Sequence, residues 1–254
     1  MLLAVDVGNS HTVVGLFDAT ELVDHWRIAT DAERTSDELA LMIQQFLGFH
    51  GFSFSGAITG VAVCSGVPML TAALREMTER YFGFGALVLE PGVRTGMPIL
   101  YDNPKEVGAD RIANAIGAFD RYGGPAIVVD FGTATTVEVI SAKGEYLGGA
   151  IVPGIEISLD ALFARAAALR RVELVAPKNV IGKSTIEAIQ SGAVYGFSGQ
   201  VDAIVDRFEA ELGQSTVVST GGLAELIMPH SRTIQHFEPW LTLQGLRIVH
   251  ERNR

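Results

Sequence analysis

Two short polar turns carry the first residues that could do chemistry. The segments Asp6-Val7-Gly8-Asn9-Ser10 and Asp130-Phe131-Gly132-Thr133 each place a carboxylate just before a turn of small residues. Glycine lets backbone N–H groups approach a phosphate closely, and hydroxyl and amide side chains add donors. A carboxylate repels a bare phosphate, so its presence indicates a cation that bridges phosphoryl oxygens directly or through water. Each turn alone is explained at least as well as a plain hairpin with an Asx-type turn. Two matched turns favour nucleotide binding.

A third candidate lies in the stretch DNPKEVGADR, residues 102–111. Phosphoryl transfer needs positioned charge and a group that receives the proton of the acceptor hydroxyl. Asp110 could be that base, and Arg111 could hold an anionic group of the substrate. The plainer alternative is a carboxylate that favours a helix N-terminus, followed by a surface arginine. Spacing alone favours this alternative slightly.

Two glycine-containing segments remain. The run TVVSTGGL, residues 216–223, predicts a buried strand that ends in two glycines, against which a ribose or a flat ring could lie. The run Gly182-Lys183-Ser184-Thr185 resembles the end of a P-loop, but the motif needs a glycine where Pro177 stands. We expect Ser184 to cap a helix instead, together with Glu187 three residues later.

The elements that carry these residues form an internal repeat. Without gaps, Asp6 falls on Asp130, Gly8 on Gly132 and Thr12 on Thr136. Each copy predicts a strand, a tight turn and an antiparallel strand. Both halves then continue with a third strand, a helix, and alternating strands and helices, which is typical of a mixed sheet with helices on its faces. We predict domains at residues 1–116 and 117–254, joined by a helix near residues 110–122.

The predicted elements of the first half are strands 22–29, 57–64 and 86–89, a helix that begins near Thr35 or Ser36 with Glu38, and a helix at 68–81. Those of the second half are a strand at 145–151, helices at 155–168 and 185–212, a strand at 216–219 and a short helix after residue 222.

Composition narrows the classes of function. The 254 residues carry a formal net charge of −10, whereas a general nucleic-acid binder shows a basic stripe. Cys64 is the only cysteine, so an internal disulfide is excluded, and its apolar neighbours predict a buried, unreactive thiol. The six histidines have no metal-ligand spacing. Without a basic, apolar leader or a spanning segment, we expect a cytoplasmic protein that acts without membrane or nucleic acid.

Five segments together resemble the type III pantothenate kinases. They are DVGNSHTVVGLF, PKEVGADRIANAIGA, VVDFGTATTVEVI, LGGAIVPGI and STIEAIQSGAVYGF, in this order, and the likeness continues to residue 246. The resemblance implies an α/β protein with a duplicated actin-like ATPase (ribonuclease H-like) fold, in which two domains hold mixed five-stranded sheets flanked by helices. It also implies ATP-dependent phosphorylation of pantothenate to 4'-phosphopantothenate, the first step of coenzyme A biosynthesis. A homodimer, Mg²⁺ and a monovalent cation, K⁺ or NH₄⁺, are implied as well.

The resemblance assigns roles to individual positions. Asp110 is similar to the proton acceptor, Asp130 to the ligand of the monovalent cation, and Asp6 to the residue that organises Mg²⁺, directly or through water. ATP contacts are implied at Asp6, Val7, Gly8, Asn9, Ser10, His11, Thr12, Val13 and Thr133. Pantothenate contacts are implied at Tyr101, Gly108, Ala109, Asp110, Arg111 and Thr185, the last from the second subunit. For the same reason we expect part of the helix face with Ala193, Val194, Phe197 and Val201 to be dimer interface.

Two other functions stay open. One is a different enzyme on the same scaffold, such as a sugar or acetate kinase or a phosphatase. The other is a regulatory or transcription-accessory protein that keeps the fold without catalysis. The intact acidic set of Asp6, Asp110 and Asp130, together with the acidic composition, argues against the second.

Overall fold

The computed structural model describes residues 1–52 and 54–254, which form two compact units. The first unit contains Met1–Pro98, Asp102–Gly117 and Leu241–Arg254, and the second contains Ile99–Tyr101 and Ala118–Trp240. The C-terminal segment thus belongs to the first unit, and a three-residue segment before residue 102 belongs to the second. The functional division into domains 1–116 and 117–254 stays a prediction.

The first unit is built on a mixed sheet of five strands in the order β3-β2-β1-β4-β5. β1, β2 and β3 are antiparallel neighbours, whereas β4 pairs parallel to β1 and β5 parallel to β4. The strands are β1 (Leu2–Val7), β2 (His11–Asp18), β3 (Glu21–Ala29), β4 (Gly60–Ser65) and β5 (Leu87–Val88). This confirms the predicted mixed sheet and the predicted succession of strands along the chain.

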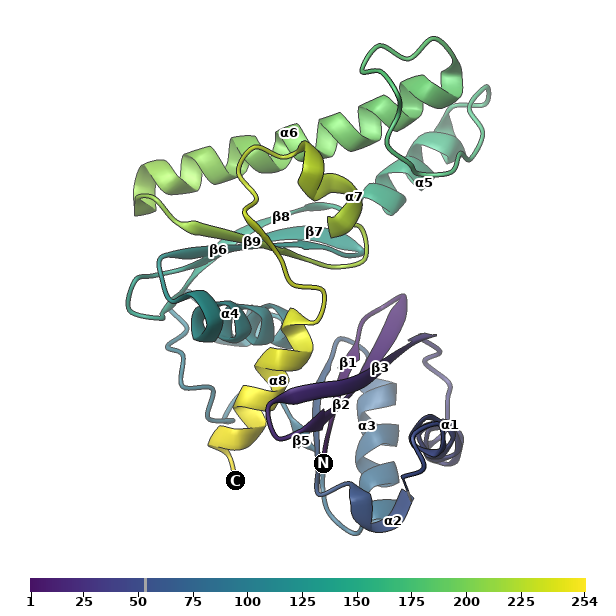
Figure 1. The fold of residues 1–254 in the computed structure, drawn as a ribbon, viewed down its shortest axis with the longest axis vertical. Helices are drawn as coiled ribbons and strands as arrows, with labels where there is room; N and C mark the ends of the chain where they lie inside the picture. The colour runs from purple at the N-terminus through teal and green to yellow at the C-terminus, as the bar shows by residue number, and fades with distance from the viewer. Residues whose placement is uncertain (53) are drawn as a thin grey trace. The chain divides into compact units, whose positions relative to one another are not determined.

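Helices α1 (Ser36–Gly48) and α3 (Pro68–Met77) cover one face of this sheet (Figure 1). The helix α1 begins with the predicted capping box, because the Thr35 hydroxyl accepts from the Glu38 N–H while the Glu38 carboxylate accepts from the Thr35 N–H. Its apolar side chains pack on alternate residues of β1, which builds the core of the unit. Phe46 of α1 also stacks on Trp26 of β3, with ring centroids 5.0 Å apart.

The opposite face of the sheet is covered by α8 (Leu241–Arg252), which the apolar pattern does not predict. α8 packs against the first part of α4 (Ala109–Tyr122) at a glycine. A Cβ on Gly245 would lie 1.9 Å from the Ala113 carbonyl oxygen, so only glycine permits this approach. The Thr242 hydroxyl also donates to the Asn114 amide oxygen at 2.7 Å. The N-terminal end of α4 is therefore fixed to the first unit.

The second unit repeats this sheet, with strand order β10-β9-β6-β7-β8. The strands are β6 (Ala126–Phe131), β7 (Ala134–Ile140), β8 (Tyr146–Pro153), β9 (Thr216–Thr220) and β10 (His236–Phe237). Helices α5 (Ile155–Arg165), α6 (Thr185–Leu212) and α7 (Ala224–Ile227) complete the unit, and α6 lies along the face of the sheet that carries Ile127 and Val129 (Figure 1). Ser184 and Glu187 cap α6 as predicted.

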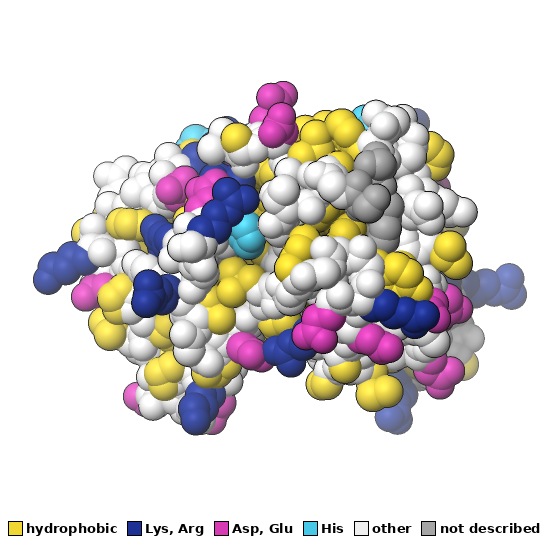
Figure 2. All heavy atoms as spheres, turned by 90° about the horizontal axis from the view of Figure 1, so that it is seen from below, with side chains coloured by type: hydrophobic (Ala, Val, Ile, Leu, Met, Phe, Trp, Pro, Cys, Tyr) yellow, Lys and Arg dark blue, Asp and Glu magenta, His cyan; other side chains and the backbone are white. Residues whose placement is uncertain are grey.

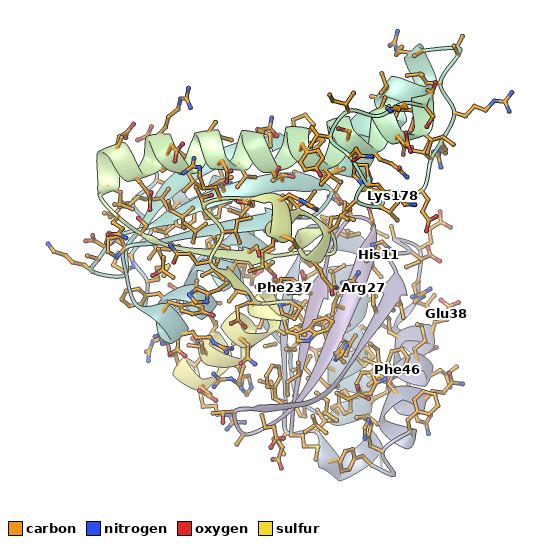
Figure 3. The ribbon with its side chains drawn as sticks, turned by 45° about the horizontal axis from the view of Figure 1, so that its top comes forward. His11, Arg27, Glu38, Phe46, Lys178 and Phe237 are labelled. Carbon is orange, nitrogen blue, oxygen red and sulfur yellow. The ribbon has the colours of Figure 1, made fainter. Side chains whose placement is uncertain are left out.

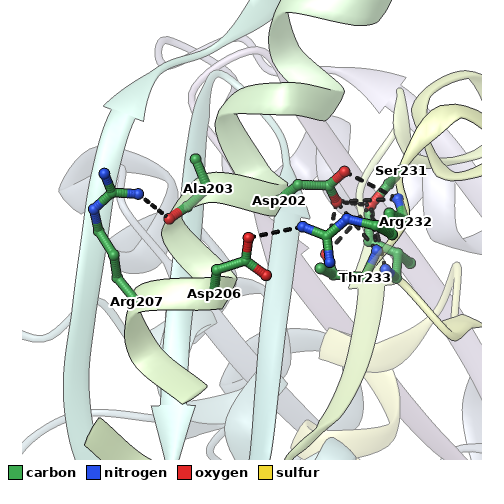
Figure 4. A network of polar contacts seen from close by, with 8 residues as sticks. Asp202, Ala203, Asp206, Arg207, Ser231, Arg232 and Thr233 are labelled. Atoms are coloured by element: carbon green, nitrogen blue, oxygen red, sulfur yellow. Dashed lines mark hydrogen bonds and ion pairs between the residues drawn. The ribbon is translucent and has the colours of Figure 1, made fainter. Parts of the chain in front are cut away.

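An acidic residue of α6 anchors the loop that follows α7 and the short 3-10 helix Met228–His230. Asp202 accepts hydrogen bonds from the Ser231 and Thr233 hydroxyls and from the Arg232 and Thr233 N–H groups, at 2.6–3.1 Å (Figure 4). Burial alone would raise the pKa of Asp202, but these hydrogen bonds hold it below its ordinary value. Asp206, one turn further along α6, pairs with Arg232 at the surface.

Several element boundaries differ from the sequence prediction. Ala57 ends a short helix, α2 (Phe54–Ala57), and β4 begins three residues later than expected. The helix α3 ends at Met77 and continues as a π-helical turn, Thr78–Phe82, and α5 ends at Arg165 rather than Ala168.

The helix face expected at a dimer interface is also corrected. Ala193, Val194 and Val201 are at most 3% exposed, and Phe197 packs on the core of the second unit, so the face is core.

The visible surface mixes charges of both signs. On the face shown in Figure 2, acidic and basic side chains are interspersed among apolar and uncharged groups. Among the described residues, none of the helices combines the length and apolar character needed to cross a bilayer.

Candidate active site

The carboxylate of Asp6 lies near the carboxyl end of β1, on the sheet face that α8 covers. Its cross-strand partner in β4 is Cys64, whose thiol is fully buried and donates to Asp6 Oδ1 at 3.2 Å. Burial raises the pKa of Asp6 to about 6, the Cys64 hydrogen bond opposes this shift, and the negative charge of Asp110 adds to it. Burial likewise raises the pKa of Cys64 far above its ordinary value, so the thiol stays protonated, as predicted for an unreactive cysteine.

Asp110 belongs to the same unit and lies at the start of α4 with an exposed side chain. Its Oδ1 accepts from the Arg111 N–H at 2.8 Å, and a Cβ on Gly108 would lie 2.5 Å from that oxygen. Gly108 thus leaves room for the carboxylate. Because the charge of Asp110 acts on both Asp6 and Cys64, the structure brings together two of the three predicted acidic residues. Arg111, by contrast, is 8% exposed and not a surface arginine.

The first polar turn, Gly8 to Ser10, is held by the end of β3. The Thr30 hydroxyl donates to the Gly8 carbonyl at 2.7 Å, and the Thr30 N–H donates to the Ser10 carbonyl at 3.0 Å. Asn9, Ser10 and His11 are exposed, so their polar groups are accessible to a ligand. Sequence reasoning missed Thr30, which a search for residues at the end of the predicted third strand would have found.

The strand register places a basic residue of β3 on the same face of the sheet as Asp6. Asp6 pairs with Val13 in β2, and Val13 pairs with Arg27 in β3, so all three side chains emerge on one face of the sheet. His11 lies two residues from Val13 and shares this face; Figure 3 labels both His11 and Arg27. The exposed Arg27 was not predicted as a site residue, because only the register relates it to Asp6.

In the second unit, Asp130 occupies the position in β6 that Asp6 occupies in β1, with residues of the neighbouring strands beside it. Asp130 pairs with Thr136 of β7 and with Thr220 of β9. Gly221 has a φ of 91°, and a Cβ there would lie 2.5 Å from Asp130 Oδ1. The paired glycines after β9 therefore let the backbone approach the carboxylate, which a larger residue would prevent.

The two turns are not superimposable residue for residue. Four residues separate the paired Val7 and Thr12, whereas three residues separate the paired Phe131 and Thr135. The counterpart of Thr12 is consequently Thr135, and the ungapped match of Thr12 with Thr136 is wrong by one position. Both Thr12 and Thr135 are buried, which agrees with this corrected alignment.

The remaining predicted residues lie in the second unit. Thr133 is exposed in its turn, and its carbonyl accepts from the Gly154 N–H at 3.1 Å. Tyr101 is partly buried against Tyr146 of β8. Thr185 is exposed at the first position of α6.

Oxygen donors at both acidic positions fit hard cations. Asp6 is a partly buried carboxylate whose ionised form is disfavoured by burial, so a cation would stabilise it. Asp130 stands between two threonine hydroxyl positions, an oxygen-rich set suited to a cation such as K⁺ or Mg²⁺. The residues present therefore fit the cations that the sequence resemblance implies.

Comparisons with known proteins agree with this description. Residues 2–207 match the family model described as type III pantothenate kinase. Curated proteins named type III pantothenate kinase include one from Streptomyces griseus, 58% identical over 100% of this chain and 98% of that protein, and one from Moorella thermoacetica, 56% identical over 100% of both chains.

Solved structures share the fold at low identity. A conserved putative Baf family transcriptional activator from Campylobacter jejuni has a TM-score of 0.61 at 20% identity and covers 99% of this chain and 98% of its own. The ROK hexokinase from Thermus thermophilus has a TM-score of 0.52 at 12% identity, with 100% and 99% covered.

Two mixed five-stranded sheets, each with an acidic turn after its first strand, place the chain in the class of α/β proteins whose fold the solved structures above share. Within that class, the chain belongs to the type III pantothenate kinase family. It is an enzyme, a pantothenate kinase, and its reaction is the first step of coenzyme A biosynthesis.

Proposed function

We propose that Asp110 is the catalytic base that receives the proton of the primary hydroxyl of pantothenate. The hydroxyl oxygen forms a bond to the γ-phosphorus of ATP, the bond from that phosphorus to the bridging oxygen breaks, and ADP leaves with the electron pair. The observation that carries this assignment is the position of Asp110, an exposed carboxylate at the start of α4 that acts electrostatically on the partly buried Asp6.

Asp6 and Asp130 have supporting roles in this proposal. Asp6 organises Mg²⁺, directly or through water, and Asp130 holds K⁺ or NH₄⁺. Such cations neutralise charge on the phosphates of ATP. The protein's own contribution is to hold each carboxylate in place: Cys64 orients Asp6 by a hydrogen bond, and Gly221 allows the chain to pack tightly around Asp130.

Binding residues are proposed for both substrates. The segment Asp6 to Val13 and Thr133 contact ATP, in agreement with the exposed polar groups of both turns. Gly108, Ala109 and Arg111 contact pantothenate next to Asp110, and Tyr101 and Thr185 are further contacts. These last two are proposed on the resemblance alone.

We also propose a cytoplasmic homodimer in which Thr185 reaches the site of the other subunit. Exposed apolar side chains in the second unit support this. Val180, Ile181 and Ile186 are 61%, 80% and 55% exposed and lie on or just before the start of α6, and Ile151 of β8 is 61% exposed. Apolar side chains grouped at a surface mark interaction sites.

The test is ADP release with a panel of acceptors. Pantothenate should support turnover, whereas hexoses, acetate and other small alcohols should not. Turnover with a sugar or acetate in place of pantothenate would indicate a different kinase. A protein that binds ATP without releasing ADP with any acceptor would indicate a regulatory role.

A further inference from the structure

A buried acidic residue in the second unit has no role in the mechanism above. Glu138 in β7 and Tyr146 in β8 are each 0% exposed, and the Tyr146 hydroxyl donates to Glu138 Oε2. Burying a carboxylate is costly unless it is hydrogen-bonded, so such a group is retained where it fixes a neighbour in one arrangement. The neighbour of this pair is Tyr101.

Main-chain contacts tie Tyr101 to Tyr146. The Leu100 N–H donates to the Tyr146 carbonyl at 2.8 Å, and Ile99 forms a parallel bridge with Tyr146. Residues 99–101 therefore run beside the start of β8. Side-chain contact follows from this pairing, since the Tyr101 and Tyr146 rings lie with centroids 6.4 Å apart and planes tilted by 58°.

Gly148 of β8 lies next to the Tyr101 ring. Its φ is 122°, which favours glycine, and a Cβ there would lie 3.4 and 3.5 Å from two carbons of the Tyr101 ring. The Tyr101 ring thus lies beside Tyr146 and Gly148 of β8. Glu138 holds Tyr146 in the orientation that makes this possible.

We infer that the Glu138–Tyr146 pair positions Tyr101 for pantothenate binding. The inference rests on the proposed contact between Tyr101 and pantothenate. A ring that is already fixed loses less rotational freedom when the substrate binds, which improves affinity without a new contact. Because Tyr101 binds and does not react, the effect falls on the KM for pantothenate and leaves kcat unchanged.

The central test is Tyr146→Phe, which keeps the ring and removes the hydroxyl donor. We expect the KM for pantothenate to rise about tenfold, with kcat and the KM for ATP within about twofold of wild type. Tyr122→Phe is the matched control, because Tyr122 makes the same kind of bond to Glu238 elsewhere in this unit. That variant should keep the wild-type KM for pantothenate. An unchanged KM in Tyr146→Phe, or an equal rise in both variants, overturns the inference.

Tyr101→Ala separates this inference from the proposed contact. If Tyr101→Ala leaves the KM for pantothenate unchanged, both the contact and the inference are wrong. If it raises the KM while Tyr146→Phe does not, only the inference is wrong. Should both single variants raise it, the double variant should be no worse than Tyr101→Ala, because Tyr146 acts through Tyr101. If the effects of the two single variants on the KM for pantothenate are additive in free energy in the double variant, Tyr146 does not act through Tyr101.

Thermal melting shows whether each variant is folded. If Tyr146→Phe does not fold, the test uses Glu138→Gln instead. The amide oxygen of the new side chain still accepts the hydrogen bond from Tyr146 but carries no charge. A neutral hydrogen bond is about half as strong, so we expect a rise in KM for pantothenate of about threefold. No rise would overturn the inference.

Discussion

Cys64 and Asp6 lie opposite each other on the parallel strands β4 and β1, and the thiol donates a hydrogen bond to the carboxylate at 3.2 Å. The carboxylate is thereby oriented by a group that cannot itself ionise near neutral pH, because burial holds the pKa of Cys64 well above its usual range. A residue 58 positions away in the sequence therefore orients the carboxylate that is proposed to organise Mg²⁺.

Removal of this donor should change the pH dependence of the kinase. Burial raises the pKa of Asp6 to about 6, and the Cys64 hydrogen bond lowers it, so Cys64→Ala should raise it further. A carboxylate with a higher pKa loses its charge at higher pH. The acid limb of kcat/KM for ATP should consequently move up by about half a pH unit, with little loss at pH 8. Cys64→Ser keeps a donor and is the control; superimposable profiles of Cys64→Ala and wild type would contradict the role of the thiol.

Asp202 should stabilise the second unit in a pH-dependent way. The folded-state pKa of Asp202 lies below its ordinary value, so its contribution is present above about pH 4 and is lost as the pH falls through the folded-state pKa. Asp202→Asn should lower the free energy of unfolding by about 2 kcal/mol at pH 7, since hydrogen bonds to a charged group become weaker bonds to a neutral amide. The difference from wild type should shrink below pH 4.

Asp206→Asn is the control for that measurement. Its partner is the same arginine, but the side chains of Arg232 and Asp206 are 65% and 50% exposed, and an ion pair so exposed contributes less than about 1 kcal/mol. Urea unfolding of both variants at several pH values makes the comparison. Equal losses in the two variants would show that the hydrogen bonds of Asp202 to the loop add no stability.

The proposed cation role of Asp130 predicts a change in ionic requirement. Asp130→Asn keeps the shape of the side chain next to Gly221 but removes its charge. Activation by K⁺ should then need a concentration at least about tenfold higher, because a charged oxygen ligand is lost. Initial rates measured with K⁺ replacing Na⁺ at constant ionic strength test this. A variant with the wild-type K⁺ dependence would exclude Asp130 as the ligand.

Dimer formation should depend on the exposed apolar residues of the second unit. Ile181→Glu places a charge at a position that is 80% exposed in the single chain and should shift the protein toward monomer in sedimentation. Phe49→Glu changes a residue of similar exposure, 76%, in the first unit and should leave the oligomeric state unchanged. Monomeric wild type, or equal behaviour of both variants, would contradict this surface.

The same proposal predicts complementation between subunits. If Thr185 serves the site of the other subunit, a mixture of Asp110→Asn and Thr185→Ala chains forms heterodimers in which one site has both native residues. Refolding the two inactive or weakened variants together should restore ADP release, whereas mixing them without subunit exchange should not.

Sequence patterns predicted most of the strands of the two sheets, whereas the roles of the site residues stay predictions. The matched apolar runs and polar turns around Asp6 and Asp130 identified the two hairpins, and the capping signals at Thr35 and Ser184 located α1 and α6. These features are local, so a short window of sequence contains them. The helix α8 was missed because Thr242, Gln244 and Gly245 interrupt its apolar pattern. Gly245 is needed there for contact with the backbone of α4.

Features that depend on register or on distant partners could not be predicted. The turn after β1 is one residue longer than the turn after β6, and only the pairings of Thr12 with Val7 and of Thr135 with Phe131 reveal it. The alignment of Arg27 with Asp6 passes through β2 and follows from the same register. The Cys64–Asp6 hydrogen bond likewise needs the parallel pairing of β1 and β4, which are separated in the sequence by two strands and two helices.

The most direct test of the mechanism is the turnover of Asp110→Asn. ADP release with saturating pantothenate and ATP should fall by at least about a hundredfold, the usual contribution of a general base, while ATP binding and the melting temperature stay near wild type. Near-normal turnover in a folded variant that still binds ATP would show that another group receives the proton.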